Sequence, residues 1–238
     1  MVKGFINTAL ESKMLSAEKF SDILQQKAEQ TKIVSFINPF SYPLIAKSLN
    51  LIEEIDYWFV DGMALCHLSN LRRKNNLLRA SFDLSSIARD CFDYASKKEV
   101  NVALVGASES EIKLACSNLK KLFPNLKIVY SHHGFIKNKF ESVYEDIEES
   151  NANYLIVGMG TPMQEEFAIG CRKVCPSLSL ILTCGGFLTQ TAMKPDYYHP
   201  LIKKFGLRWL QRAYLHSYVR KRLIKDYPSF IIRYLFNR

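Results

Sequence analysis

Asp61 stands where an apolar run ends, a place where a carboxylate could do chemistry. In YWFVDGMAL, residues 57–65, it directly follows a strongly apolar segment, and Gly62 permits a tight turn or the close approach of a ligand. A carboxylate held rigidly at such a point can take a proton from an attacking hydroxyl, which is worth roughly a hundredfold to ten-thousandfold in rate. Asp-Gly is also a common turn sequence, so Asp61 is either a general base or a turn residue.

A second stretch, VGMGTPMQEEFA at residues 157–168, continues a short apolar, β-branched run. It predicts a buried strand, a glycine turn and a helix start. Thr161 is a good helix N-cap, Pro162 suits the first helical position, and Gln164 is spaced to complete a capping box. This structural role explains the three residues as well as a role in ligand binding does.

The charge at this helix start limits which ligand it suits. A helix N-terminus behind a glycine turn exposes unpaired N–H groups and usually favours phosphate. Glu165 and Glu166 occupy the first turn, however, and two carboxylates would repel a diphosphate. The ribose and base of a nucleotide suit the site better, so any diphosphate would need cations from elsewhere.

Those cations are concentrated in the C-terminal segment. The chain has 238 residues and a formal net charge of +9. Residues 1–193 contain 21 basic and 21 acidic residues, whereas residues 194–238 contain 11 basic and 2 acidic ones. The whole excess of positive charge therefore lies in the tail.

Apolar runs recur along the chain at intervals that suit alternating strands and helices. The expected strands are residues 32–37, 55–60, 100–106, 126–131, 153–158 and 178–186, with helix-like stretches such as 85–98 and 110–123 between them. This alternation predicts an α/β fold, a Rossmann-like parallel sheet with helices on both faces. The composition changes once, near Lys194, which divides the chain into a body of residues 1–193 and a basic, amphipathic helical appendage of residues 194–238.

In such a sheet, ligands bind beyond the carboxyl ends of the strands. We therefore expect the ligand site to be formed by residues that leave those ends: Asn38, Gly106, Gly158, Gly160, Thr161, Pro162, Gln164, Glu165, Gly185 and Gly186.

Several other classes of protein are disfavoured. No apolar stretch approaches the roughly eighteen residues of a membrane span, and the N-terminal residues make a poor signal peptide. The six cysteines form no CxxC pair, which indicates reduced, mostly buried thiols in a cytoplasmic protein. No Asp-x-Asp pattern, which often holds a metal on a sugar nucleotide, stands at the carboxyl end of a strand. We therefore expect neither a metal nor another cofactor.

The tail, residues 201–238, interleaves basic residues with aromatic and aliphatic ones. Bases for phosphates and aromatics for stacking would suit nucleic acid. A helix on an anionic membrane, with aromatics at headgroup level, is the second interpretation, and an ordinary packed helix with a solvated basic face is the third. The many apolar residues of YPSFIIRYLF favour the membrane, and the zero net charge of the body disfavours nucleic acid.

Five motifs, in this order, resemble the WecG/TagA/CpsF family of glycosyltransferases. They are Asp61-Gly62, HHGF (132–135), VGMGTPMQE (157–165), GGF (185–187) and GLRWLQR (206–212), and the likeness extends from about residue 31 to the end. The resemblance implies a metal-independent, inverting transferase that passes a sugar from a UDP donor to a polyprenyl-diphosphate-linked sugar.

The resemblance also implies roles for individual residues. The base of the family falls on Asp61, its donor-site Asn on Asn38 and its donor-binding Gln on Gln164. Its arginines for the diphosphate and the acceptor fall on Arg79, Arg212, Arg220 and Arg222, and Arg208, on a helix face shared with Arg212, joins this set.

The chain departs from the family pattern near the ligand. Phe36 stands where the family usually has Thr, so any hydroxyl role there is lost. The Phe-Asp of the family's GGxFD segment has become Phe187-Leu188, and the Glu before the tail Trp has become Arg208. Sugar specificity therefore cannot be carried over from better-known members.

The sequence thus predicts an inverting glycosyltransferase that acts in cell-surface polysaccharide biosynthesis. Its partners would be a UDP-sugar, a polyprenyl-diphosphate-linked acceptor and the anionic inner face of the cell membrane, to which it would bind peripherally. The sequence leaves open whether the protein forms a homo-oligomer. The alternative is a non-catalytic nucleotide-binding module whose basic tail binds nucleic acid.

Overall fold

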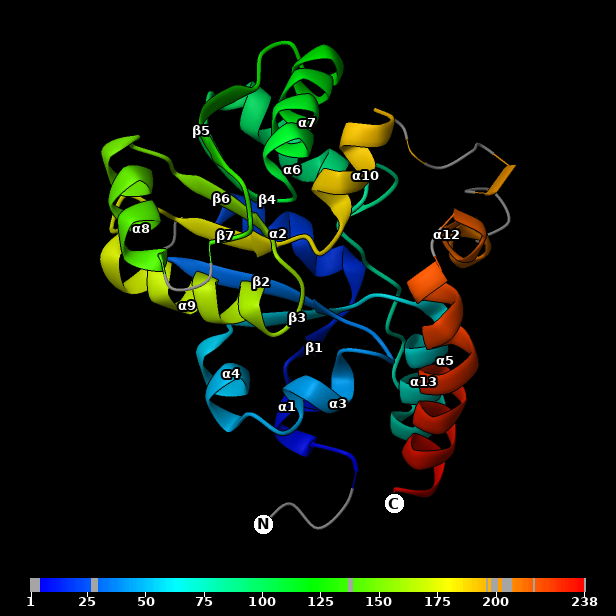
Figure 1. Ribbon diagram of the computed structural model, residues 1–238. Coiled ribbons are helices and arrows are strands. Elements are labelled where there is room, and N and C mark those ends of the chain that lie inside the picture. The colour runs from blue at the N-terminus through cyan, green and yellow to red at the C-terminus, as the bar shows by residue number, and fades with distance from the viewer. Residues whose placement is uncertain are drawn as a thin grey trace.

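A seven-stranded parallel sheet forms the centre of the molecule. The computed structural model describes residues 5–26, 30–136, 139–195, 197, 201–202, 207–215 and 217–237, apart from the side chains of Arg212 and Tyr218. The strand order is β1-β3-β2-β7-β6-β4-β5 (Figure 1). The strands are β1 Met14–Leu15, β2 Lys32–Ile37, β3 Tyr57–Val60, β4 Asn101–Gly106, β5 Lys127–His132, β6 Tyr154–Gly158 and β7 Leu180–Thr183.

The six strands expected from the sequence are all present, and β2 has the predicted bounds. The other five begin one or two residues later than expected. β1 was not predicted, because two residues, Met14 and Leu15, are too few to show an alternating pattern, although they pair with β3. The parallel sheet is confirmed.

Helices cover both faces of the sheet, as predicted. One face shares a buried apolar cluster with α1 Thr8–Ser12, α3 Tyr42–Ile45, α4 Leu49–Glu54, α5 Met63–Arg73, α8 Phe140–Glu149, α9 Met163–Val174 and α13 Ser217–Phe236. The other face packs against α2 Phe20–Gln25, α6 Ile87–Lys97, α7 Glu109–Leu122 and α10 Phe187–Met193, with the short 3₁₀ turn η1 Ala17–Lys19 before α2. Alternate strand residues serve the two clusters, as the pleat of a strand requires.

The predicted capping box at the start of α9 is wrong. The helix begins at Met163 with Pro162 as its N-cap residue, after a cis Thr161–Pro162 peptide bond, and no side chain caps it. The Gln164 side chain bonds to side chains and to a distant amide instead: its Nε2 donates to Thr161 Oγ1 at 3.3 Å, and its Oε1 accepts a hydrogen bond from the Gly185 amide at 3.1 Å. A capping box does occur at α7, between Ser108 and Glu111.

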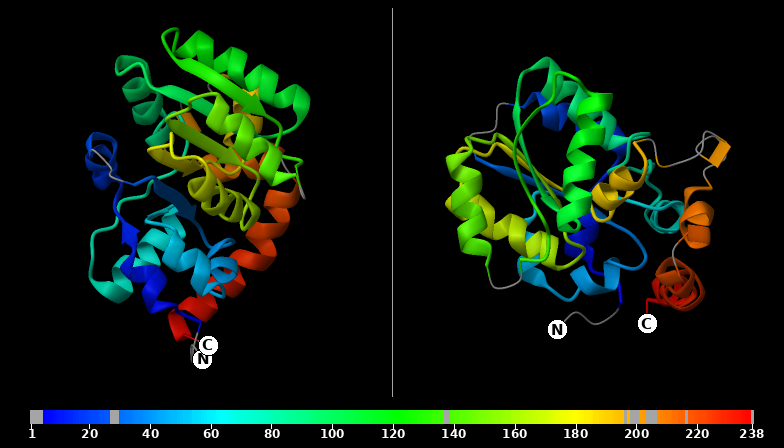
Figure 2. Two further views of the ribbon diagram at one scale, coloured as in Figure 1. Left: turned by 90° about the vertical axis from the view of Figure 1, so that its left-hand side faces the viewer. Right: turned by 45° about the horizontal axis from the view of Figure 1, so that its top comes forward.

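The C-terminal helices α12 (Arg208–Leu215) and α13 lie on one side of the molecule, with α13 beside α5 (Figures 1 and 2). Phe230 and Tyr234 of α13 belong to the main apolar cluster. The amide of Ile6 donates to Asn237 Oδ1 at 2.8 Å, so the first and last described segments meet. The division near Lys194 stays a prediction, but α13 completes the core of the body.

Two further expectations concern the cysteines and membrane-spanning helices. Five of the six cysteines are buried and Cys116 is half-buried, as predicted. Among the described helices, none is long and apolar enough to cross a membrane.

Candidate functional site

A cavity of about 450 Å³ lies at the carboxyl edge of the sheet. This size is typical of small-molecule sites, which range from about 300 to 1,000 Å³. Ten of the sixteen predicted site residues line it: Asn38, Asp61, Arg79, Gly158, Gly160, Thr161, Gln164, Gly185, Gly186 and Arg222. The structure thus brings most of the predicted residues together at one edge of the sheet, and their roles in a ligand site stay a prediction.

Asp61 is placed by the pairing of β2 with β3. Ile37 pairs with Val60, so the residues that follow the two strands leave the sheet together, and the Asp61 amide donates to the Ile37 carbonyl at 2.7 Å. Gly62 then turns the chain into α5 with a φ of +111°, a conformation that L side chains rarely adopt. The Asp61 carboxylate is one-quarter exposed and accepts a hydrogen bond from Arg79 Nη2 at 3.0 Å.

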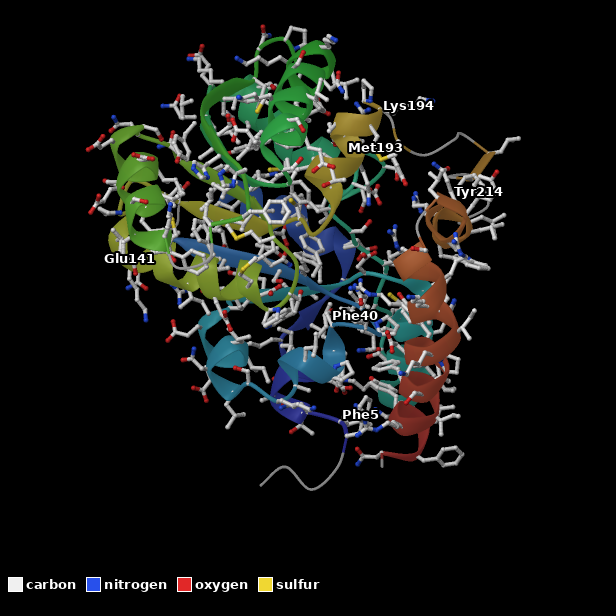
Figure 3. The ribbon with its side chains drawn as sticks, viewed as in Figure 1. Phe5, Phe40, Glu141, Met193, Lys194 and Tyr214 are labelled. Atoms are coloured by element: carbon white, nitrogen blue, oxygen red, sulfur yellow. The ribbon has the colours of Figure 1, made fainter. Side chains whose placement is uncertain are left out.

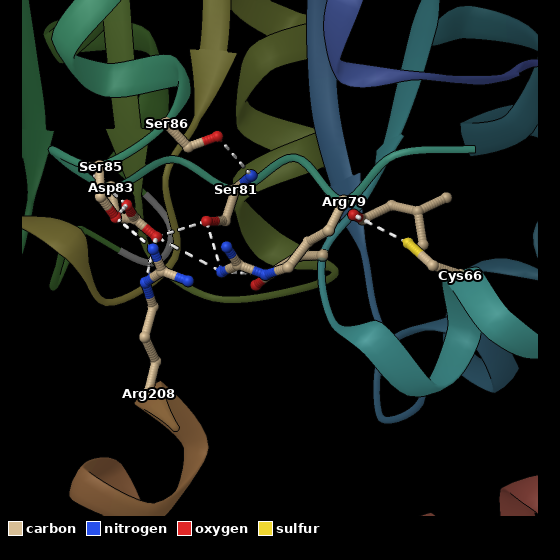
Figure 4. Close-up of polar contacts among 9 residues, drawn as sticks. Cys66, Arg79, Ser81, Asp83, Ser85, Ser86 and Arg208 are labelled. Carbon is tan, nitrogen blue, oxygen red and sulfur yellow. Dashed lines mark hydrogen bonds and ion pairs between the residues drawn. The ribbon is translucent and has the colours of Figure 1, made fainter. Parts of the chain in front are cut away.

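Arg79 joins Asp61 to a second, more buried carboxylate, Asp83. Its Nη2 lies 2.6 Å from Ser81 Oγ and 3.3 Å from Asp83 Oδ2 (Figure 4). Burial alone would raise the pKa of Asp83. Hydrogen bonds from Ser81 and Ser85 and the charges of Arg79 and Arg208 outweigh that effect, so the pKa lies below its usual value. Asp83 is therefore a fixed negative charge.

Arg208 binds the tail to the segment that contains Asp83 and Ser85. It begins α12, and its Nη2 donates to Ser85 Oγ at 2.7 Å while its Nε lies 3.9 Å from Asp83 Oδ2 (Figure 4). Arg208 does not itself line the cavity. Its contacts explain how the segment after the body is held near the site.

The other three tail arginines that were predicted as site residues differ in position. Arg222 lines the cavity, with its guanidinium carbon 3.5 Å from the centre of the Phe40 ring. Phe40 lies on the side of the body that faces α13 (Figure 3). Arg220 instead donates to the Ala213 and Tyr214 carbonyls at the end of α12, away from the cavity. The side chain of Arg212 lies outside the described part of the chain.

Gln164 forms part of the floor of the cavity, and Glu165 supports Gln164. Gln164 lines it, whereas the Glu165 side chain is fully buried behind it. Glu165 Oε1 accepts hydrogen bonds from Gln164 Nε2 at 2.9 Å and Ser35 Oγ at 2.8 Å. Burial raises the pKa of Glu165, which these hydrogen bonds only partly offset. Glu165 thus orients Gln164 from behind, and the predicted role in direct donor binding stays a prediction.

The glycines have two different roles. A Cβ on Gly106 would lie 2.4 Å from the Gly158 carbonyl oxygen, and one on Gly158 would lie 2.7 Å from the Gly185 oxygen, so close strand packing needs both. Gly160, with a φ of +81°, has open space around it and lines the cavity. Gly106 and Pro162 do not line the cavity.

Asn38 has one side-chain atom already engaged. Its Oδ1 accepts from the Phe40 and Ser41 amides at 2.9 and 3.1 Å, which forms an Asx turn at the end of β2. In the described part of the chain its Nδ2 makes no hydrogen bond, so this group can be offered to a ligand.

Two of the three departures from the family pattern, Phe36 and Phe187-Leu188, lie beside the cavity. Phe36 lines it, stacked on Phe59 with ring centroids 6.0 Å apart. Leu188 is fully buried in the cluster of that face. Both positions are apolar contacts that hold the wall of the cavity.

Sequence reasoning missed three parts of this site. The serines around Asp83 were not singled out, although Ser-x-Asp-x-Ser is a common turn pattern. The lining residues Phe135 and Glu111 were not predicted either. Phe135 was named only as part of the HHGF motif, with no role in the site, and Glu111 carries the signal of a capping box, Ser108-x-x-Glu111, rather than that of a ligand site.

No group of three or more His, Cys, Asp or Glu side chains that could hold a metal ion occurs among the described residues. The site offers arginines as counter-charges. Metal independence stays a prediction.

Comparisons with known proteins show the family of the chain. The chain is 40% identical over 214 residues, 89% of each chain, to a UDP-Gal:alpha-D-GlcNAc-diphosphoundecaprenol beta-1,4-galactosyltransferase of Shigella boydii. It is 26% identical over 185 residues, 78% of this chain and 71% of the relative, to an N-acetylglucosaminyldiphosphoundecaprenol N-acetyl-beta-D-mannosaminyltransferase of Staphylococcus aureus strain MW2. The model of the glycosyl transferase WecG/TagA/CpsF family matches residues 7–238, and the chain therefore belongs to that family of glycosyltransferases.

Proposed function

We propose that this member of the WecG/TagA/CpsF family transfers a sugar from a UDP-sugar to N-acetylglucosamine carried on a polyprenyl diphosphate, with inversion at the anomeric carbon. The observation that carries the proposal is the placement of Asp61 beside Arg79 in a cavity that Arg222 also lines. A base for a hydroxyl and two cations for a diphosphate are what a single displacement on a nucleotide sugar needs.

The proposed reaction is one step. The acceptor hydroxyl oxygen attacks the anomeric carbon as the bond from that carbon to the β-phosphate oxygen breaks. The hydroxyl proton goes to Asp61, and the negative charge that develops on the leaving UDP is met by Arg79 and Arg222. Attack from the face opposite the leaving group turns an α-linked donor into a β-linked product, which agrees with the beta linkage in the names of both relatives.

Galactose is the first sugar to test. The relative at 40% identity uses UDP-Gal, whereas the one that transfers N-acetylmannosamine is 26% identical. We propose α-linked GlcNAc-diphosphoundecaprenol as the acceptor on the same ground.

A lipid-linked acceptor requires the protein to work at a membrane, and the tail supports peripheral attachment. Trp209, Tyr214 and Ile224 on α12 and α13 are 52%, 82% and 78% exposed, and Tyr214 projects from α12 in Figure 3. Near an anionic surface each Lys or Arg contributes about 1 kcal/mol, which salt screens. We place the protein at the inner, cytoplasmic face of the membrane.

We also propose that the reaction needs no metal ion. Arg79 and Arg222 provide the counter-charge that a divalent cation supplies on many nucleotide sugars. Full activity in EDTA is the expected result, and a loss that Mn²⁺ or Mg²⁺ restores would contradict it.

The test of the function is a turnover assay on GlcNAc-diphosphoundecaprenol in anionic vesicles. UDP-galactose, UDP-glucose, UDP-GlcNAc and UDP-ManNAc are supplied in parallel, and released UDP and lipid-linked disaccharide are both measured. Turnover of one donor to a β-linked disaccharide is expected. Binding of DNA or RNA in a gel shift, with no turnover of any donor, would favour the nucleotide-binding module instead.

A further inference from the structure

The two ends of the cavity differ in charge. Arg79 and Arg222 are the basic residues among its described lining residues, and both lie toward the β3 and β2 side, where Arg79 pairs with the carboxylates of Asp61 and Asp83. At the other end, the wall includes Glu111 on α7, which follows β4, Phe135, which follows β5, and Thr189 on α10, which contacts Glu111. An anionic diphosphate therefore belongs at the first end, and a neutral part of the donor at the second.

One carboxylate oxygen of Glu111 is held by hydrogen bonds within the protein. Its Oε2 accepts hydrogen bonds from the amide and the hydroxyl of Ser108, both at 2.8 Å, and from Thr189 Oγ1 at 3.4 Å. Its Oε1 has no hydrogen-bond partner in the described part of the chain. The carboxylate is thus held in place through one oxygen, with the other available in a half-buried side chain that lines the cavity.

The distance along the sheet edge suits a nucleotide sugar. Asp61 follows β3 and Glu111 follows β4, and these strands are four positions apart in the sheet. At about 4.8 Å between neighbouring strands, the span is about 19 Å. With the reacting sugar at Asp61 and the diphosphate beside Arg79 and Arg222, the nucleoside would extend toward Glu111.

The chemistry of a carboxylate selects which part of the nucleoside it meets. An ionised carboxylate only accepts hydrogen bonds. The ribose has two neighbouring hydroxyl donors, whereas the uracil edge flanks its one N–H with two carbonyl oxygens that a carboxylate would repel. Because Glu111 also occupies the Ser108 amide at the start of α7, that helix N-terminus is not free for a phosphate.

We propose that Glu111 binds the 2′- or 3′-hydroxyl of the donor ribose and makes the enzyme selective for ribonucleotide over deoxyribonucleotide sugars. This inference rests on the proposed function, since it assumes a UDP-sugar donor. Glu111 would be a specificity residue at the end of the cavity opposite the reacting atoms.

The test measures the dissociation constants of UDP, 2′-deoxy-UDP and 3′-deoxy-UDP by calorimetry. The full-length protein should bind UDP about tenfold or more tightly than one of the deoxy analogues, the range for a hydrogen bond to a charged group. In Glu111→Gln that preference should fall to a small factor, because the amide that replaces Oε1 is no longer a charged acceptor. A merely structural capping role would weaken all three ligands together and leave their ratio unchanged.

Two further variants keep the result decisive. Glu109→Gln, on the same turn of α7 but paired with Lys113 on the surface, should keep the full preference. Glu111→Asp keeps a carboxylate for the helix N-terminus but withdraws it from the cavity, so it tests the contact should Glu111→Gln fail to fold, and it too should lose the preference. If the wild-type protein binds no UDP, the proposed function fails. If it binds and turns over a UDP-sugar but does not distinguish UDP from either deoxy analogue, only the assignment of Glu111 is wrong.

Discussion

Asp83 and Glu165 are both buried carboxylates beside one cavity, yet their surroundings favour opposite charge states. Two serines and two arginines hold the pKa of Asp83 below its usual value, although burial alone would raise it. No cation is among the groups that act on Glu165, and burial raises its pKa above the usual value. The same side-chain chemistry is thus kept ionised at one place and driven toward the neutral form at the other.

This difference assigns different functions to two parts of the site. The Asp61–Arg79–Asp83 end holds full charges where a proton and a diphosphate must be handled. Under Gln164, burial drives Glu165 toward its neutral form, and a neutral carboxyl does not weaken the attraction of Arg79 and Arg222 for an anionic donor. Four changes would break or sharpen this comparison.

The largest effect is expected from Asp61→Asn, at the charged end. The amide keeps the shape of the side chain but cannot accept the proton, so turnover should fall by about a hundredfold to ten-thousandfold. The affinity for UDP should stay close to that of the wild type. Asp22→Asn, at a surface carboxylate that is 61% exposed, is the control. Wild-type turnover by Asp61→Asn would refute the assignment of the base.

The next largest effect is expected from Arg222→Gln. A charged hydrogen bond contributes about 1.5–3 kcal/mol, so its loss should reduce turnover by roughly tenfold to a hundredfold, on a water-soluble acceptor analogue as well as on vesicles. Arg220→Gln, two residues away but bonded to the end of α12, should change turnover on the soluble analogue little. Equal losses in the two variants would mean that both arginines act only through the fold or the membrane.

Asp83→Asn should mainly affect stability. The change removes the counter-charge of two arginines whose side chains are 18% and 19% exposed, so the cost is reduced by solvent to about 2 kcal/mol at neutral pH. Since the folded pKa of Asp83 is lowered, its contribution is present above the unfolded value and is lost as pH falls below about 4. Urea unfolding of the two proteins at pH 7 and pH 3 should therefore show a difference that shrinks in acid.

Glu165→Gln should have the smallest effect and the opposite pH trend. Because the folded pKa is raised, the wild type loses stability as pH rises from about 4.3 through the folded value, by about 1.4 kcal/mol for each unit of the shift. A neutral Gln has no such loss, so the variant should become relatively more stable between pH 5 and pH 8. Melting temperatures across that range would show it, and a parallel decline in both proteins would contradict a raised pKa.

Most of the fold was predictable from the sequence because the signals are local. Short β-branched runs mark the strands, and the residues that follow them, such as Asn38, Asp61 and Gly185, reach one edge in any parallel sheet. The start of α9 was mispredicted because Gln164 bonds to Gly185, a partner far away in the sequence that no local capping rule contains.

The unpredicted part of the site likewise depends on contacts between distant segments. The tail arginines look alike in the sequence, yet Arg222 reaches the cavity while Arg220 binds the end of α12. Their difference comes from how α13 packs on α5, which a basic, apolar pattern leaves undetermined.

The packing of α13 also has a consequence for how the chain folds as it is made. Glu11, near the start, is 2% exposed and accepts hydrogen bonds from Tyr42 and, at 2.6 Å, from Tyr234, besides its ion pair with Arg72. The ribosome produces all seven strands before α13, so a nascent chain can form the sheet while the surroundings of Glu11 are still open to water. During that interval the rings of Phe5 and Tyr42 lack the Phe230 side chain that later covers them. During synthesis an apolar surface and the Glu11 carboxylate within it are therefore exposed until α13 emerges and covers them.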